Sequence, residues 1–82
     1  MKHAGPSALD AIEPLLADLR ACDGLKERTR GSFYRKSSGF LHFHEDPSGL
    51  HADVQIAGQF QRFRAETPEE QAALLALVRA QV

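Results

Sequence analysis

Three of the four histidines lie close together in the stretch LHFHEDPSGLHAD, residues 41–53. His42 and His44 precede the turn-forming sequence DPSG, and His51 and Asp53 follow it. Imidazole and carboxylate groups are common ligands of zinc and other divalent transition metals. If the two segments are paired strands, the four side chains share one surface. The first functional hypothesis is therefore a zinc-like metal site formed by His42, His44, His51 and Asp53.

The residues around the histidines predict the hairpin that such a site needs. Strand side chains alternate between the two faces of a sheet, and the residues that alternate with the histidines form an apolar set. This set is Leu41, Phe43, Leu50, Ala52, Val54 and Ile56. A two-residue turn at Pro47-Ser48 places His44 opposite His51 and His42 opposite Asp53. A slip by one residue would set histidines against the apolar face, so the alternation favours this register.

Two further segments with a period of two, residues 31–36 and 60–65, predict flanking strands of an antiparallel meander. A turn at Ser37-Ser38 would place Phe33 opposite His42 and Arg35 opposite Phe40, with Tyr34 on the other face. A turn at Gly58-Gln59 would place Arg64 opposite Asp53 and Arg62 opposite Gln55. The histidine face would then also carry an anion-binding and partner-binding set: Arg35, Arg62, Arg64, Phe33, Phe40 and Phe60.

This face supports two hypotheses besides a metal. Arginines beside aromatic rings on an open sheet are typical of anion or nucleic-acid binding, although the formal net charge of −1 argues against nucleic acid without excluding it. Exposed phenylalanines also favour a protein partner or a homodimer that packs sheet against sheet. The plainest alternative is an ordinary wet sheet face, on which His and Asp are common, with the N-terminal segment or residues 25–30 covering the phenylalanines.

The remaining segments predict two helices that flank the strands. In TPEEQAALLALVRAQV, Thr67 caps a helix, Pro68 takes its first position and Glu70 completes a capping box. A second helix is expected over about residues 8–21 with Ser7 as its cap, and Pro14 either kinks it or begins its regular part. Residues 1–6 are expected to be a loose lead and residues 25–30 a connector. The predicted fold is a two-layer α+β sandwich of helix, four-stranded antiparallel meander and helix, with both helices on one sheet face.

Composition limits what the chain can be. Its 82 residues suffice for one small domain, residues 1–82, with an ordinary globular balance of apolar and charged residues. The single cysteine, Cys22, cannot form an internal disulfide, and the sequence contains no signal peptide or membrane span, so a cytoplasmic location is expected. Sequence motifs for hydrolases, nucleotide-binding loops and redox thiols are absent, which favours a protein that is not an enzyme.

A family resemblance rests on the stretch FYRKSSGFLHFHEDPSGLHADV, with the strand GFLHFH at 39–44, ADVQI at 52–56 and the later segment QRFRAETPEEQ. Over roughly residues 24–80 the chain resembles small bacterial proteins that carry a "luciferase domain" label and have no established biochemical role. The resemblance implies an α+β fold and no catalytic residue, and it does not imply light emission. The sequence ACDGL departs from the apolar-Pro-Gly sequence typical of that family.

The sequence as a whole therefore predicts a small cytoplasmic binding or accessory protein. Its partner or ligand is expected to bind to the open sheet face.

Overall fold

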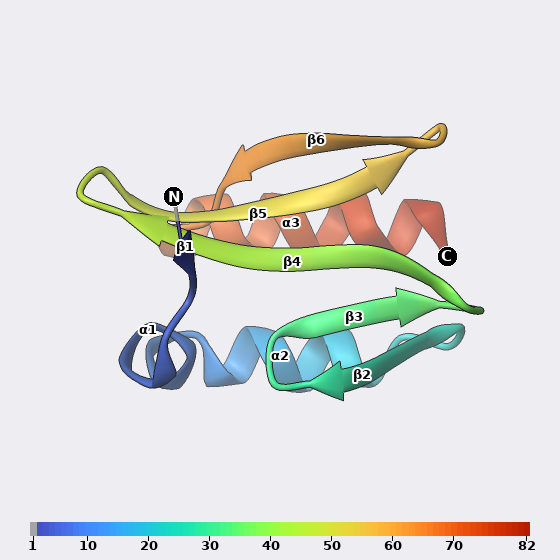
Figure 1. The fold of residues 1–82 in the computed structure, drawn as a ribbon, viewed down its shortest axis with the longest axis horizontal. Helices are drawn as coiled ribbons and strands as arrows, with labels where there is room; N and C mark the ends of the chain where they lie inside the picture. The colour runs from blue at the N-terminus through green and yellow to red at the C-terminus, as the bar shows by residue number, and fades with distance from the viewer. Residues whose placement is uncertain (1) are drawn as a thin grey trace.

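The computed structural model describes residues 2–82, which form an antiparallel sheet with helices on one side (Figure 1). The strands are β1 (Lys2–His3), β2 (Leu25–Thr29), β3 (Ser32–Arg35), β4 (Ser38–Asp46), β5 (Gly49–Ile56) and β6 (Gln59–Arg64). The helices are α1 (Pro6–Ala11), α2 (Glu13–Arg20) and α3 (Pro68–Gln81). The sheet order is β2-β3-β4-β5-β6, and β1 pairs with β4. The predicted α+β fold is confirmed, with more strands in the described residues than expected.

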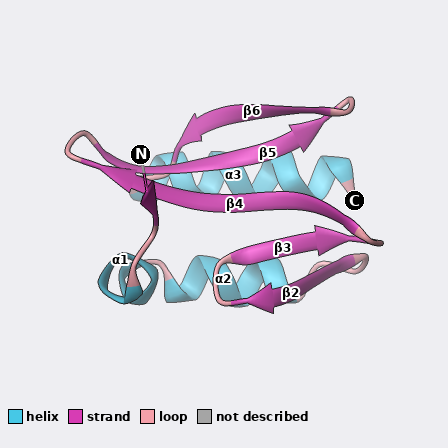
Figure 2. Cartoon of the chain, viewed as in Figure 1, coloured by secondary structure: helices cyan, strands magenta, loops and turns pink. Residues whose placement is uncertain are grey.

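The core lies between the sheet and the helices. Figures 1 and 2 look onto the sheet, and both α2 and α3 lie behind it. One apolar cluster joins side chains of β3, β4 and β5 to side chains of all three helices. Its fully buried members include Phe33, Leu41 and Val54 from the sheet and Leu16, Leu19 and Val78 from the helices. The opposite face of the sheet has no helix against it among residues 2–82, so it is the face available to a ligand.

The N-terminal helical region is divided in two. Gly5 occupies the cap position of α1 without a side-chain hydrogen bond, so the expected cap at Ser7 is wrong. The helix breaks at Ile12, and Pro14 lies in the first turn of α2, where its missing N–H costs no helical hydrogen bond. Of the two roles considered for Pro14, the start of a regular helix is therefore the one observed.

The central hairpin has the predicted register. His44 lies opposite His51, His42 opposite Asp53, and Asp46 opposite Gly49 at the turn. The partner pair Phe43 and Ala52 faces the core, as the alternation of apolar residues requires.

The β3–β4 hairpin differs from the expectation. Arg35 pairs with Ser38, so the turn lies at Lys36-Ser37, one residue earlier than expected, and Lys36 adopts φ of 58°. Phe33 lies opposite Leu41 on the core face and is fully buried, whereas Tyr34 lies on the open face. The displaced turn alone changes the register by two residues and would keep every face. A bulge in β4 reduces the change at Phe33 to one residue, and this odd shift reverses the faces of the β3 side chains.

Phe40 occupies a β-bulge in the same hairpin. The register shifts there, because Phe33 pairs with Leu41 while Tyr34 pairs with Gly39, and Phe40 is left without a partner on β3. The Phe40 side chain is 2% exposed and belongs to the core cluster. The prediction that Phe33 and Phe40 are exposed on the open face is therefore wrong.

The β5–β6 hairpin differs by two residues. Its turn is Ala57-Gly58, with φ of 53° and 83°, as two-residue hairpin turns of the primed types require. Arg62 consequently lies opposite Asp53, and Arg64 lies opposite His51. A shift by two residues keeps each side chain on its expected face but changes its partner.

Two segments predicted to lack secondary structure are strands. Residues 25–29 pair with β3, because Leu25 packs against the core and Glu27 binds Arg20 of α2. Lys2 and His3 pair with Glu45 and His44 along the same edge of β4 that β3 uses, so residues 2 and 3 are not a loose lead.

The C-terminal helix begins as predicted. The Thr67 side chain accepts a hydrogen bond from the backbone N–H of Glu70, and the Glu70 carboxylate accepts from the N–H of Thr67 at 3.0 Å. This reciprocal pair satisfies two donors that the first turn would otherwise leave unpaired. Across residues 2–82, every helix is too short or too polar to span a membrane.

Candidate binding face of the sheet

All four histidines lie on the open face of the sheet. The strand β1 adds His3 to the three histidines of the central hairpin, because His3 is the direct partner of His44. The ring centroids of His3 and His44 are 4.7 Å apart, and those of His42 and His44 are 6.5 Å apart. The fourth histidine, His51, lies opposite His44 on β5. His3 escaped the sequence prediction because a strand of two residues has no periodicity to detect.

Asp53 is held by Arg62. The guanidinium donates two hydrogen bonds to the two carboxylate oxygens, at 2.8 and 2.9 Å, and these bonds lower the pKa of Asp53. The Nε2 atom of His44 lies 3.3 Å from the same carboxylate. Both carboxylate oxygens of Asp53, which was expected to bind a metal, thus already accept hydrogen bonds.

The histidine cluster does not have the arrangement of a metal site. The planes of the His3 and His44 rings are tilted by 31° relative to each other. In the described part of the chain, no group of three or more His, Cys, Asp or Glu side chains could hold a metal ion. The hypothesis of a zinc-like site at His42, His44, His51 and Asp53 therefore has no structural support.

Burial favours the neutral form of these histidines. Desolvation lowers the pKa of His42 and of His44, and the nearby His3 lowers both further, while Asp53 opposes the shift. The Nδ1 atoms of His44 and His51 are enclosed and have no hydrogen-bond partner within residues 2–82. A proton on Nδ1 of His44 would be a buried and unpaired N–H, which is costly. Burial therefore favours the uncharged imidazole at His42 and His44.

A row of rings crosses the sheet beside the histidine cluster. The centroid of His42 is 5.7 Å from that of Phe60 on β6 and 6.3 Å from that of Tyr34 on β3. At the β2 end, the Cζ atom of Arg28 lies 4.7 Å from the centre of the Tyr34 ring, a cation–π contact. The Phe60 side chain is 50% exposed. Arg28 was missed because residues 25–30 were expected to be a connector, and Tyr34 was missed because it was expected on the helix side of the sheet.

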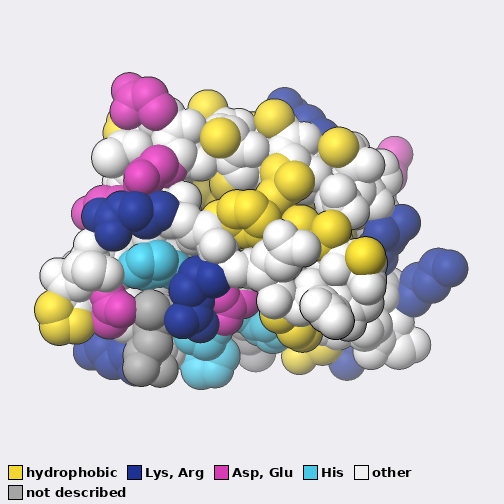
Figure 3. Space-filling model, turned by 90° about the horizontal axis from the view of Figure 1, so that it is seen from above, with side chains coloured by type: hydrophobic (Ala, Val, Ile, Leu, Met, Phe, Trp, Pro, Cys, Tyr) yellow, Lys and Arg dark blue, Asp and Glu magenta, His cyan; other side chains and the backbone are white. Residues whose placement is uncertain are grey.

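The open face is more basic than the rest of the molecule. It carries Lys26, Arg28, Arg62 and Arg64 against two carboxylates, Asp53 and Asp46, as the strand registers show. Because Arg64 is paired with Glu70 of α3, the open face together with this pair has four positive and three negative charges, or +1, and the remaining residues carry −2 of the total charge of −1 with neutral histidines. Figure 3, which views the β6 side, shows histidine side chains in the lower part of the view, beside both basic (Lys or Arg) and acidic side chains.

The predicted anion-binding set is only partly on this face. Arg62, Arg64 and Phe60 lie there, whereas Phe33 and Phe40 are in the core. Arg35 pairs with Leu25, whose side chain packs against the core, so Arg35 lies on the helix side at the end of β3. The exposed phenylalanine patch that favoured a sheet-to-sheet dimer is thereby reduced to Phe60.

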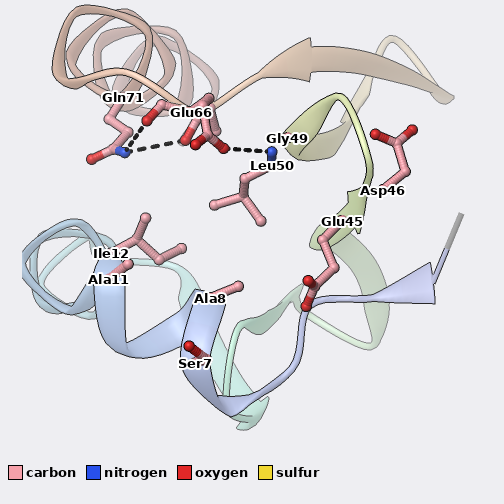
Figure 4. Close-up of a pocket in the computed structure, with 11 residues that line it drawn as sticks. Ser7, Ala8, Ala11, Ile12, Glu45, Asp46, Gly49, Leu50, Glu66 and Gln71 are labelled. Carbon is pink, nitrogen blue, oxygen red and sulfur yellow. Dashed lines mark hydrogen bonds between the residues drawn. The ribbon is translucent and has the colours of Figure 1, made fainter.

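A separate pocket of about 360 Å³ lies between α1, the β4–β5 turn and the start of α3 (Figure 4). The carboxylates that line this pocket accept hydrogen bonds from backbone N–H groups. Glu66 accepts a hydrogen bond from the N–H of Leu50 at 2.8 Å, and Glu45 accepts from the N–H of Gly5. The amide of Gln71 donates to the carbonyl of Ala65 at 3.1 Å. These groups tie the hairpin to both helical segments, so their polar atoms have a structural role.

No protein-family model, no curated protein and no solved structure matches this chain. The resemblance to the "luciferase domain" proteins therefore stays a prediction, and the function must be inferred from the open face itself.

Proposed function

We propose that this protein binds an anionic partner through the open face of its sheet. The observation that carries the proposal is the separation of charge, with +1 on the open face, the Arg64–Glu70 pair included, and −2 on the remainder. A surface of one sign attracts and orients a partner of the opposite sign even when the total charge is near zero. The total charge of −1 is therefore no argument against an anionic partner that binds to this face.

The cations at the β2 end of the face are the most accessible. Within residues 2–82, neither Lys26 nor Arg28 has a carboxylate within 4.0 Å, whereas Arg62 is paired with Asp53 and Arg64 with Glu70. An anion would therefore meet Lys26 and Arg28 without first displacing an internal partner. A cation that is already paired contributes less, because its partner must be released or accommodated.

The test is binding to heparin, used as a generic polyanion, measured by isothermal titration calorimetry at several salt concentrations. Arg28→Gln removes one charge from the open face, and Arg79→Gln removes one from the last turn of α3 on the helix side. We expect Arg28→Gln to weaken binding several-fold and to reduce the salt slope by about one, with no change for Arg79→Gln.

Equal weakening by the two variants would show that only total charge matters, and the open face would not be the binding surface. Failure of the unaltered protein to bind at low salt would reject an anionic partner altogether. The better hypothesis would then be a protein partner that is not selected by its charge. This agrees with the prediction of an accessory protein made from the sequence.

A further inference from the structure

We infer that the anionic partner is a single-stranded nucleic acid whose bases stack on the row formed by Phe60, His42 and Tyr34. This inference rests on the proposed function, since it identifies the ligand of the same face. It is drawn from the alignment of rings and cations on one surface, which charge alone does not require.

The rings of the row lie close together but are inclined to one another. The planes of His42 and Phe60 are 46° apart at a centroid distance of 5.7 Å, and those of His42 and Tyr34 are 84° apart at 6.3 Å, so bases stacked on Phe60 and on Tyr34 would be splayed apart instead of parallel. The row extends from the edge strand β6, over β5, to β4 and β3. Aromatic rings on a sheet are a common platform for bases, because every base has a flat face to stack.

The cations stand at the ends of the row, where phosphates of such a strand would lie. Arg28 and Lys26 flank Tyr34 at one end, since Lys26 is its partner on β2. Arg62 lies on β6 beside Phe60 at the other end. A row of rings between positive charges is the arrangement that a chain of bases and phosphates requires.

The accessibility of the rings distinguishes single strands from duplexes. Phe60 is 50% exposed and can accept a ring on its outer side, while His42 and Tyr34 are partly exposed. In a duplex the base faces are stacked within the helix, and only the groove edges and phosphates are presented. The half-exposed ring of Phe60 can therefore stack with an unpaired base, but not with a base inside a duplex.

The experiment compares three anionic probes by fluorescence anisotropy or competition: a single-stranded oligonucleotide of about twelve residues, inorganic polyphosphate and polyglutamate. We expect the oligonucleotide to bind most tightly. Phe60→Leu keeps an apolar side chain but removes the ring, and should weaken oligonucleotide binding about five- to 150-fold without affecting polyphosphate. Val82→Ala, at the other large exposed apolar residue within residues 2–82, is the matched control and should have no effect.

The outcomes separate the two proposals. If polyphosphate and the oligonucleotide bind equally tightly, and Phe60→Leu changes neither affinity, bases do not stack on the row. The protein would then bind anions in general, as the proposed function states. Tighter binding of polyglutamate would point to an acidic protein segment and would also overturn the nucleic-acid inference. Absence of binding to all three probes would overturn both proposals. Phe60 lies on an edge strand with an exposed side chain, so Phe60→Leu leaves the core intact.

Discussion

Replacing Phe33 tests the position of the β3 strand more directly than any other change. Phe33 is 0% exposed, whereas Phe60 is 50% exposed. Truncation of a buried phenylalanine to alanine costs about 3–5 kcal/mol, because apolar contacts are lost and a cavity remains. The same change at a half-exposed phenylalanine costs about 1 kcal/mol. The two variants Phe33→Ala and Phe60→Ala should therefore differ in stability by roughly 2–4 kcal/mol.

This difference is large for a chain of 82 residues. At about 0.05–0.15 kcal/mol per residue, the free energy of unfolding is roughly 4–12 kcal/mol. Phe33→Ala thus removes a quarter of the stability at least and all of it at most. Phe33→Leu, which keeps most of the volume, should cost only about 1 kcal/mol and should remain folded in either case.

Urea denaturation followed by circular dichroism measures these differences. With a denaturant slope of about 1 kcal/mol per molar urea, Phe33→Ala should lower the midpoint by about 3–5 M or leave no folded baseline. Phe60→Ala should lower it by about 1 M. Equal losses for the two variants would refute the reasoning, and would restore the register in which Phe33 and Phe60 share the open face.

Three further outcomes are expected. Burial lowers the pKa of His42 and His44 below 6.5, so the unfolded chain binds protons more readily, and the melting temperature should fall as the pH drops below about 6.5. His44→Gln should reduce this fall, and an identical pH profile would contradict it. Gly58→Ala should cost about 1 kcal/mol through its left-handed backbone. Gly31→Ala should cost more in a melting experiment, because its Cβ would lie 2.7 Å from a leucine of α1. Thr67→Ala should cost about 1 kcal/mol and Thr67→Ser much less in urea denaturation, since only the serine keeps the cap.

The parts of the fold that were predicted correctly are those in which two signals agree. In the central hairpin, the turn sequence DPSG and the alternation of apolar residues demand the same register, and His44 lies opposite His51 as expected. At α3, the capping residues Thr67 and Glu70 and the apolar stripe both mark a helix. Local chemistry and burial reinforce each other in such segments.

The errors occur where only one signal was available. The consecutive apolar residues Phe40 and Leu41 fit either face, and the bulge that buries both has no sequence signature. The turn at Lys36 requires a positive φ at a residue type that seldom adopts one. The strand β2 is mostly charged, and its pairing depends on the tertiary contact of Glu27 with Arg20.

The candidate site includes residues that were predicted correctly and residues that were missed. The histidines of the central hairpin and Arg62 were placed on the correct face, whereas Tyr34 and Arg28 depend on strands whose register or existence was missed. His3 shows a further limit, since its position depends on β4, about forty residues later in the chain. Contacts of that kind are determined by topology, which local pattern does not encode.

The position of β1 has a practical consequence for how the protein is prepared. Lys2 pairs with Glu45 and His3 with His44 at the end of β4, so residues added ahead of Lys2 would be attached at the edge of the histidine cluster. Figure 1 shows β1 against this end of β4. An affinity tag fused at that end, and above all a polyhistidine tag, would enlarge the imidazole cluster and compete for ligands. The other end of the chain leaves from α3, behind the sheet, where a tag would stay away from the open face. Recombinant protein intended for ligand screening should therefore carry its tag after Val82.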